Sequence, residues 1–189
     1  MSTPREDPAR MAAVNRAHEA LLEQWRKAMD LIGPGPAAPH FIDAAASVQG
    51  LPVAGRWADL GSGAGFPGIA LAGLYPDTQV DLVESRQKRA IFLQKVIGAA
   101  GLTNATARCM RSEDLERGAY DGLISRAYKS PESVLREDAA RLLRPGGLVV
   151  LLLGDGGSVD DHPGFAPFLH DRYAVPDGFR RRVALTFLG

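Results

Sequence analysis

Apolar side chains in the first part of this chain recur at helical spacing. The spacing holds over residues 7–32 and predicts one long helix. Asp7 followed by Pro8 is typical of a helix start, because aspartate caps free amides and proline fits the first turn. The sequence Gly-Pro-Gly-Pro at 33–36 ends that helix. A shorter helix is expected from Pro39 onward.

From residue 56 onward, short apolar runs alternate with helical patterns. Such alternation is typical of a parallel sheet covered by helices on both faces, so the fold class is α/β. Helices are expected at 67–74, 86–100 and 131–143. Strands are expected at 56–60, 80–84, 105–110, 120–125, 148–153 and 182–188, the last of them a candidate antiparallel strand. We therefore divide the chain into a helical N-terminal appendage, residues 1–50, and an α/β domain, residues 51–189.

Composition narrows the class of protein. The 189 residues are 46% hydrophobic and 23% charged, which are globular values and exclude a disordered, collagen-like or fibrous protein. The 22 basic residues balance 22 acidic ones, so a nucleic-acid partner would have to be held by a local patch. The single cysteine, Cys109, excludes an intramolecular disulfide and suits a reducing compartment. Its place in an expected strand predicts that it is buried.

No association with a membrane is expected. The most apolar run, residues 148–153, is far shorter than the ~20 residues that span a bilayer. The N-terminal sequence M-S-T-P-R-E-D-P-A-R has no apolar core of the kind that a signal peptide needs. We therefore expect a cytoplasmic protein.

A glycine-rich turn joins the expected strand at 56–60 to the following helix. Its sequence is D-L-G-S-G-A-G-F-P-G, at 59–68. Glycines let a ligand approach the main chain closely, and the helix N-terminus presents free amides to an anionic group. Glu84 ends the next strand, where a carboxylate can accept hydrogen bonds from ribose hydroxyls. The turn and Glu84 together predict a ligand that contains a nucleoside.

Two classes of ligand fit the sequence of this turn. Residues 63–68 also satisfy the dinucleotide pattern G-x-G-x-x-G, so a nucleotide-dependent oxidoreductase is one alternative. Asp59 favours S-adenosylmethionine, because a carboxylate there can meet the amino group of a methionine moiety, whereas a pyrophosphate gains nothing from it. The chain also lacks the second mononucleotide-binding half of a dehydrogenase sheet. S-adenosylmethionine is the better prediction.

Four segments, in this order, carry a resemblance to a known family. They are D-L-G-S-G-A-G-F-P-G-I at 59–69, E-S-R-Q-K-R-A-I-F-L at 84–93, R-S-E-D-L at 111–115 and S-R-A at 125–127. The chain resembles the RsmG/GidB family, bacterial enzymes that methylate the N7 of a guanine in the decoding-region loop of 16S ribosomal RNA. The resemblance implies a Rossmann-like class I methyltransferase fold. The N-terminal part is similar at fewer positions, among them Trp25 and the segment from His40 to Asp43.

The resemblance also implies a set of site residues. Glu84 is placed at the ribose, and the corner formed by Ser112 and Glu113 near the adenine. Arg126 is placed beside the methyl group and is the candidate catalytic residue. The full cofactor pocket would consist of Asp59, Gly61, Ser62, Gly63, Gly65, Phe66, Glu84, Ser112, Glu113 and Arg126.

The cofactor and partner follow from the same resemblance. The methyl donor would be S-adenosylmethionine, leaving as S-adenosylhomocysteine, and the partner 16S rRNA in the small ribosomal subunit. Guanine N7 carries a lone pair and no proton, so it can attack the methyl group directly, without a general base, when the reacting atoms are held in line. We expect no metal ion, because His18, His162 and His170 have no partner at metal-ligand spacing. We expect a monomer.

Contacts with RNA would be local. Three consecutive arginines, 180–182, lie in an expected strand, so Arg181 should face away from Arg180 and Arg182. Neutralisation of phosphates would make binding strongly dependent on salt. The remaining candidates are Arg86, Lys88, Arg89, Arg108 and Arg111.

Some positions depart from the family pattern. Relatives usually have N-L-T where this chain has residues 30–32, serine where it has Ala44, and lysine where it has Leu153. These departures fall on the target side and spare the glycine turn. They leave open a methyltransferase that acts on another RNA or on a small molecule, and a cofactor-binding assembly factor without catalysis. His40 and Asp43 are candidates to orient the N-terminal helices over the cofactor mouth.

Overall fold

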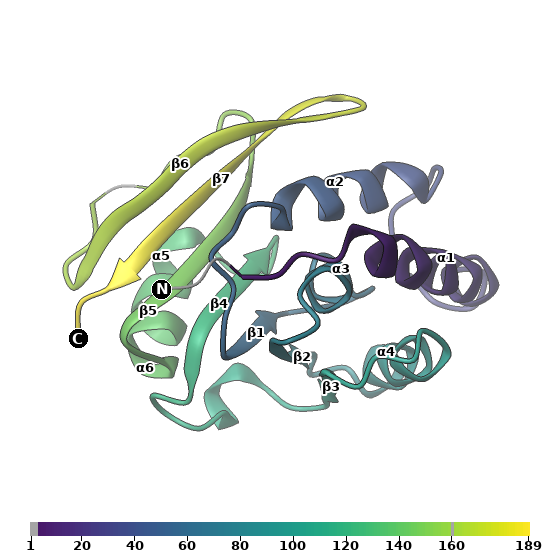
Figure 1. The fold of residues 1–189 in the computed structure, drawn as a ribbon, viewed down its shortest axis with the longest axis horizontal. Helices are drawn as coiled ribbons and strands as arrows, with labels where there is room; N and C mark the ends of the chain where they lie inside the picture. The colour runs from purple at the N-terminus through teal and green to yellow at the C-terminus, as the bar shows by residue number, and fades with distance from the viewer. Residues whose placement is uncertain (1–3, 160) are drawn as a thin grey trace.

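The computed structural model describes residues 4–159 and 161–189, which form one seven-stranded sheet with helices on both faces (Figure 1). The strands are β1 (Arg56–Leu60), β2 (Gln79–Val83), β3 (Ala105–Arg108), β4 (Tyr120–Arg126), β5 (Leu143–Gly154), β6 (Phe165–Val175) and β7 (Gly178–Phe187). Their order across the sheet is β3-β2-β1-β4-β5-β7-β6. Strands β1 to β5 pair in parallel, and β7 runs antiparallel to both neighbours. The carboxyl ends of β1, β2, β4 and β5 therefore share one edge of the sheet, where open α/β sheets bind ligands.

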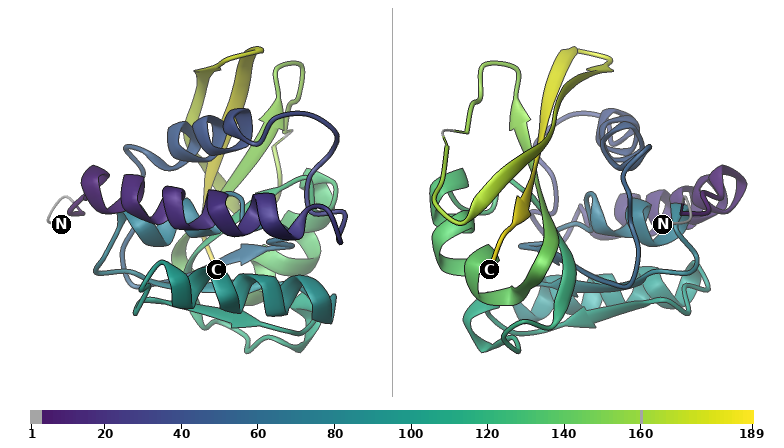
Figure 2. Two further views of the ribbon diagram at one scale, coloured as in Figure 1. Left: turned by 90° about the vertical axis from the view of Figure 1, so that its right-hand side faces the viewer. Right: turned by 60° about the vertical axis from the view of Figure 1, so that its left-hand side comes forward.

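Two hydrophobic clusters hold the helices on the sheet. The helices are α1 (Pro8–Trp25), α2 (Ala38–Val48), α3 (Gly68–Leu74), α4 (Gln87–Ala99), the short turn η1 (Ser112–Asp114), and a helical stretch made of α5 (Pro131–Ser133), η2 (Val134–Ala139) and α6 (Ala140–Leu142). Helices α1 to α4 pack on one face through side chains such as Leu22, Ile69 and Phe92, and the α5–α6 stretch packs on the other through Leu135 and Leu142 (Figures 1 and 2). The predicted α/β class with helices on both faces is confirmed. None of the helices in the described part of the chain is long and apolar enough to cross a membrane.

The first helix begins where the sequence predicts and ends earlier. A side-chain oxygen of Asp7 accepts a hydrogen bond from the main-chain amide of Arg10 at 2.9 Å, as a helix cap does. The helix stops at Trp25 rather than at residue 32, because the chain turns back there and buries Leu31 against the core. The second predicted helix is confirmed as α2.

The two N-terminal helices share their hydrophobic core with α3 and α4. Arg10 donates hydrogen bonds to the carbonyl oxygens of Ala72 and Gly73, at 2.6 and 2.9 Å, near the end of α3. The Tyr75 hydroxyl donates to the carbonyl oxygen of Val48 at 2.9 Å, at the end of α2. Both helices are thereby bonded to the α/β part of the chain, and the division into two domains stays a prediction.

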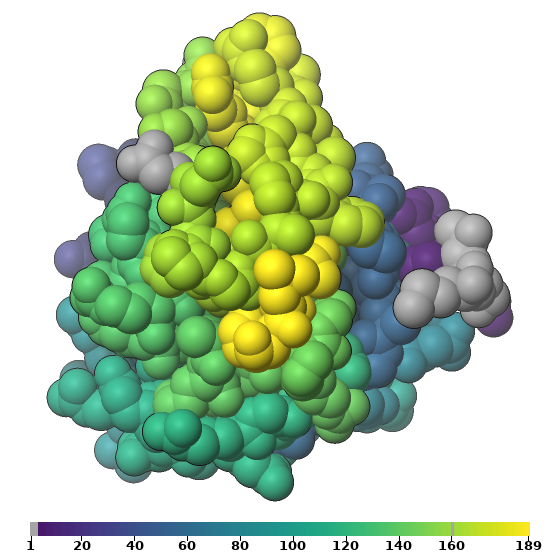
Figure 3. All heavy atoms as spheres, turned by 90° about the vertical axis from the view of Figure 1, so that its left-hand side faces the viewer, coloured from purple at the N-terminus to yellow at the C-terminus, as the bar shows by residue number. Residues whose placement is uncertain are grey.

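A hairpin formed by β6 and β7 completes the sheet. The predicted strand at 182–188 falls within β7, which is antiparallel and begins earlier, at Gly178. Strand β6 has no counterpart in the sequence prediction, because most of its side chains are partly exposed and its apolar pattern is weak. The hairpin reaches past the other strands and packs against α2 (Figure 1), and Figure 3 shows it in yellow-green and yellow across the upper part of one face.

Two sequence predictions about single side chains are wrong. Cys109 is exposed rather than buried, since β3 ends one residue earlier, at Arg108. Arg182, a predicted RNA contact, is only 7% exposed. Its guanidinium pairs with Asp171 at 2.6 Å and donates to the carbonyl oxygen of Ser47 at 3.0 Å. Arg182 therefore docks the hairpin onto the end of α2 and is not available to RNA.

Candidate functional site

The glycine-rich turn leaves β1 at the edge of the sheet where the parallel strands have their carboxyl ends. Gly61, Gly63 and Gly65 have φ values of +70°, +54° and +94°, a region that side chains other than glycine rarely occupy. The Ser62 amide donates to the carbonyl oxygen of Val83 at 3.0 Å, which ties the turn to β2. The Ser62 hydroxyl donates to the carbonyl oxygen of Asp59 at 2.9 Å. Ser62 therefore shapes the turn from within.

Asp59 lies beneath this turn and is 1% exposed. One carboxylate oxygen, Oδ2, accepts a hydrogen bond from the Gly68 amide at 3.1 Å, at the start of α3. The other, Oδ1, has no hydrogen-bond partner among the described residues. Burial raises the pKa of the Asp59 carboxyl to about 6. A buried carboxylate oxygen without a donor is uncommon, and an ammonium group would satisfy it.

Glu84 lies just beyond the carboxyl end of β2 and faces the turn. Its Oε2 accepts a hydrogen bond from the Gly63 amide at 3.2 Å, and its Oε1 accepts one from the Arg86 amide at 2.7 Å. The side chain is buried, so these two amides hold the carboxylate in one position. Glu84 is thus fixed at the lip of the turn, where the sequence predicts a ribose-binding acid.

A cavity of about 440 Å³ opens beside Glu84, and we call it the glycine-turn cavity. The Ser112 hydroxyl lies at its wall, 3.0 Å from the Tyr128 hydroxyl, whereas the Glu113 side chain is 60% exposed, with a carboxylate oxygen 3.5 Å from Lys129 Nζ. The cavity is lined by Gly61, Val83, Glu84, Ser85, Arg86, Arg89, Met110, Arg111, Ser112, Glu113, Ala127, Tyr128 and Lys129.

Tyr128 is a wall residue that sequence analysis did not single out, although it directly follows the S-R-A segment. Its ring packs on Gly61, where a Cβ would collide with it. Its hydroxyl meets Ser112, in the segment that follows β3. Tyr128 therefore joins three loops, those after β1, β3 and β4.

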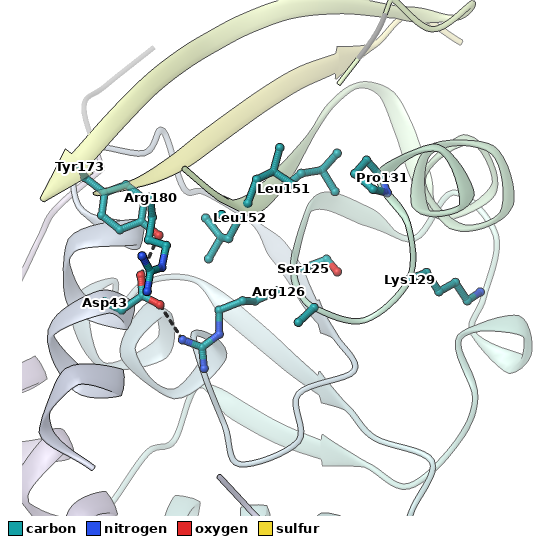
Figure 4. Close-up of a pocket in the computed structure, with 12 residues that line it drawn as sticks. Asp43, Ser125, Arg126, Lys129, Pro131, Leu151, Leu152, Tyr173 and Arg180 are labelled. Atoms are coloured by element: carbon teal, nitrogen blue, oxygen red, sulfur yellow. Dashed lines mark hydrogen bonds and ion pairs between the residues drawn. The ribbon is translucent and has the colours of Figure 1, made fainter. Parts of the chain in front are cut away.

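A second cavity, of about 310 Å³, lies at the carboxyl ends of β4 and β5, and we call it the Arg126 cavity (Figure 4). It shares Ala127 and Lys129 with the glycine-turn cavity, so the two adjoin where β4 ends. The Lys129 side chain points away from the group formed by Asp43, Arg126 and Tyr173. The cavity is lined by Asp43, Ser125, Arg126, Ala127, Lys129, Pro131, Leu151, Leu152, Leu153, Gly154, Tyr173 and Arg180.

Arg126 is held at the wall of the Arg126 cavity by partners from distant parts of the chain. Its Nη1 pairs with Oδ2 of Asp43, on α2, at 2.8 Å. Its guanidinium carbon lies over the Phe66 ring, 5.3 Å from the ring centre. The other Asp43 oxygen accepts a hydrogen bond from the hydroxyl of Tyr173, on β6, at 2.8 Å. Asp43 therefore neutralises Arg126 and connects it to the hairpin.

An aromatic cluster anchors the far end of the turn. Phe66 is buried among the rings of His18, His40 and Phe41, whose centres lie 4.8, 5.7 and 4.9 Å from its own. His18 Nε2 lies 2.7 Å from the Ala64 carbonyl oxygen, and burial lowers the pKa of this imidazole to about 4. Side chains of helices α1 and α2 therefore pack against the turn and hold it in place.

The ten predicted pocket residues thus fall into three groups. Those that line the glycine-turn cavity are Gly61, Glu84, Ser112 and Glu113, Arg126 lines the other cavity, and Asp59, Ser62, Gly63, Gly65 and Phe66 build or support the turn. Among the described residues, no group of three or more histidine, cysteine or acidic side chains is placed to hold a metal ion.

The basic residues predicted to contact RNA differ in their exposure and in whether they already have a partner within the protein. Arg86, Arg89 and Arg111 line the glycine-turn cavity, and Lys88 is exposed at the start of α4. Arg181 is exposed on the opposite face of β7 from Arg180 and Arg182, as strand alternation predicts. The candidates with an acidic or main-chain partner are Arg89, whose Nη2 is 2.7 Å from the Asp30 carbonyl oxygen, Arg108, 3.1 Å from Asp81, and Arg180, 2.8 Å from Asp177.

The fold is that of a Rossmann-like class I methyltransferase. The structure is similar to that of an O-methyltransferase from Bacillus cereus in complex with S-adenosylhomocysteine, with a TM-score of 0.60 and 16% identity, over 93% of this chain and 90% of that one. The predicted fold is therefore confirmed.

Sequence comparison identifies the family. The model of the GidB family, rRNA small subunit methyltransferase G, matches residues 15–159. The chain is 33% identical to ribosomal RNA small subunit methyltransferase G of Wolinella succinogenes over 85% of its own length and 86% of the relative's. The corresponding protein of Stenotrophomonas maltophilia is 38% identical over 71% of this chain and 65% of the relative. The chain belongs to the rRNA small subunit methyltransferase G family, and the predicted family and its S-adenosylmethionine dependence are confirmed. The roles of single site residues stay predictions.

Proposed function

We propose that this protein is a cytoplasmic, monomeric enzyme that uses S-adenosylmethionine to methylate N7 of a guanine in the decoding-region loop of 16S rRNA. One observation carries the proposal beyond family membership. The glycine-turn cavity and the Arg126 cavity share the lining residues Ala127 and Lys129 at the end of β4, so a donor in one would lie next to an acceptor in the other. Arg126 and its partner Asp43 line the Arg126 cavity, which would be the acceptor side.

The residues of the glycine-turn cavity fit the methyl donor. Glu84 would accept hydrogen bonds from the ribose hydroxyls, and Ser112 and Glu113 would border the adenine. The unsatisfied Oδ1 of Asp59 would accept a hydrogen bond from the amino group of the methionine moiety. No side chain crowds the main chain at Gly63, since the atom nearest to a Cβ there would be the Gly61 carbonyl oxygen at 3.7 Å. When bound, the donor supplies a methyl group on a positively charged sulfur.

The Arg126 cavity would hold the target guanine. N7 attacks without losing a proton, so no residue is needed as a general base, and the protein acts by fixing positions. Positive charge develops on the purine during transfer, and a free cation nearby would oppose it. Asp43 neutralises Arg126 at 2.8 Å, so the guanidinium can help to bind the substrate with little repulsion.

RNA would be held by cations around the two cavities. We propose that Arg86, Arg111 and Arg180, together with Arg181 on the other face of the hairpin, contact phosphates. Because the whole chain has no net charge, these local contacts would supply the electrostatic attraction to RNA.

Mapping of methylated guanines in 16S rRNA by mass spectrometry tests the proposal, with RNA from cells that contain or lack the protein. We expect one N7-methylguanine in the decoding-region loop to disappear with the protein, and the purified enzyme to restore it on unmethylated 30S subunits. An intact methyl group, with S-adenosylmethionine still bound by the purified protein, would point to another RNA or a small molecule as the acceptor. Binding of the cofactor without transfer to any of these would point to an assembly factor.

A further inference from the structure

Tyr173 comes from a part of the chain that the family model does not match. That match ends at residue 159, and Tyr173 lies in β6. It nevertheless lines the Arg126 cavity, together with Arg180, its partner across the hairpin. Figure 4 shows the Tyr173 side chain directed toward Asp43, which in turn faces Arg126.

The Asp43 carboxylate has one partner for each oxygen. Oδ1 accepts from the Tyr173 hydroxyl and Oδ2 from Arg126 Nη1, both at 2.8 Å. Two anchors on opposite oxygens prevent the carboxylate from rotating about its Cβ–Cγ bond. Without the Tyr173 hydroxyl, Asp43 and Arg126 would be held to each other and free to turn as a pair.

The hairpin that carries Tyr173 is itself fixed to α2. Arg182 pairs with Asp171 and donates to the main chain at Ser47, which holds the hairpin close to the end of that helix. Burial and the nearby Asp43 carboxylate raise the pKa of the Tyr173 phenol, so it stays protonated and donates its hydrogen bond at every working pH.

We propose that Tyr173 is a positioning residue for methyl transfer, and that it acts through Asp43 to hold Arg126 at the wall of the Arg126 cavity, next to the junction of the two cavities. This proposal rests on the proposed function in that it assigns the reaction to this junction. It makes the β6–β7 hairpin part of the active site, although the hairpin lies outside the matched family region.

Tyr173→Phe tests the proposal, because it removes the hydroxyl and keeps the ring. The matched control is Asp155→Asn, which breaks the exposed ion pair between Asp155 and Arg172, next to Tyr173 on the opposite face of the same strand. We expect Tyr173→Phe to slow single-turnover methyl transfer to 30S subunits about tenfold, at unchanged affinity for S-adenosylmethionine and unchanged melting temperature. Asp155→Asn should keep the wild-type rate.

A second measurement does not depend on the substrate. The Nε–H resonance of Arg126 in the ¹⁵N spectrum of the free protein, assigned through its loss in Arg126→Lys, should shift or broaden in Tyr173→Phe and stay in place in Asp155→Asn. If wild-type enzyme transfers no methyl group to 30S subunits, the proposed function fails, and this resonance still decides whether Tyr173 positions Arg126. The role of Tyr173 is overturned if the Arg126 resonance in Tyr173→Phe is the same as in wild type. It is also overturned if Tyr173→Phe and Asp155→Asn lose the same fraction of the methyl-transfer rate.

Discussion

His18 Nε2, on α1, donates a hydrogen bond of 2.7 Å to the carbonyl oxygen of Ala64, in the middle of the glycine-rich turn. The two residues are 46 positions apart in the chain. The bond requires a proton on Nε2 only, so a buried neutral imidazole is sufficient, and burial indeed lowers its pKa to about 4. A helix outside the central sheet therefore helps to set the conformation of the glycine-rich turn.

The pH dependence of stability should reveal His18. Its folded pKa, about 4, lies below the ordinary 6.5, so the unfolded chain binds more protons between these values. Its contribution is complete above pH 6.5 and falls by about 3 kcal/mol as the pH drops to 4. Asp59 has the opposite sign: its pKa is raised from 3.8 to about 6, so its contribution is complete below pH 3.8 and is lost as the pH rises through 6.

These two slopes oppose each other between pH 4 and 6, and single variants should separate them. In Asp59→Asn the free energy of unfolding should rise with pH over this range, relative to wild type. In His18→Phe it should fall over the same range. Urea denaturation at half-unit pH steps measures both differences, and parallel curves for the two variants would contradict the assigned burial effects.

Glu84→Ala should weaken binding of S-adenosylmethionine by about 1–3 kcal/mol, because ribose hydroxyls would lose a buried acceptor. The turn would also lose the carboxylate that accepts from the Gly63 amide. Isothermal titration calorimetry measures the change, with Glu19→Ala on the exposed side of α1 as the control. An affinity for S-adenosylmethionine equal to that of wild type would show that Glu84 does not bind the cofactor.

Gly61→Ala should abolish cofactor binding and destabilise the turn. Position 61 has a φ of +70°, and a Cβ there would collide with the Tyr128 ring. Gly98→Ala offers a contrast within α4, where a Cβ would meet nothing within 4 Å. That substitution should stabilise the fold by about 0.5–1 kcal/mol. Thermal denaturation and calorimetric titration of both variants check the pair, and Gly61→Ala with wild-type affinity would contradict the packing.

Local sequence was sufficient to predict where the glycine-rich turn and Glu84 lie in the fold. The turn from Asp59 to Gly68 and the acid at Glu84 are set by short-range rules, glycine conformation and the end of a strand, and both lie where they were expected. Trp25 shows the limit of such rules, because the helical pattern runs past it while the chain turns to bury Leu31.

Long-range pairing accounts for what sequence reasoning could not reach. Tyr173 meets Asp43 across 130 positions, on a strand whose partly exposed side chains give little apolar alternation. Arg182 was expected at the surface with its two neighbours, since nothing in three consecutive arginines shows which one becomes buried against a carboxylate of another strand. Its partner, Asp171, lies on that same unpredicted strand.

Arg181 and Arg182 should therefore respond differently to the same substitution. Arg181→Ala should leave the fold intact and weaken binding to 30S subunits, with a salt dependence reduced by about one charge. Arg182→Ala should destabilise the protein by about 2 kcal/mol or more, because Asp171 and the Ser47 carbonyl lose their shared donor. Binding measured at several salt concentrations, together with urea denaturation, distinguishes the two roles. A stable Arg182→Ala variant with weakened RNA binding would reverse the assignment and return Arg182 to the RNA-contacting surface.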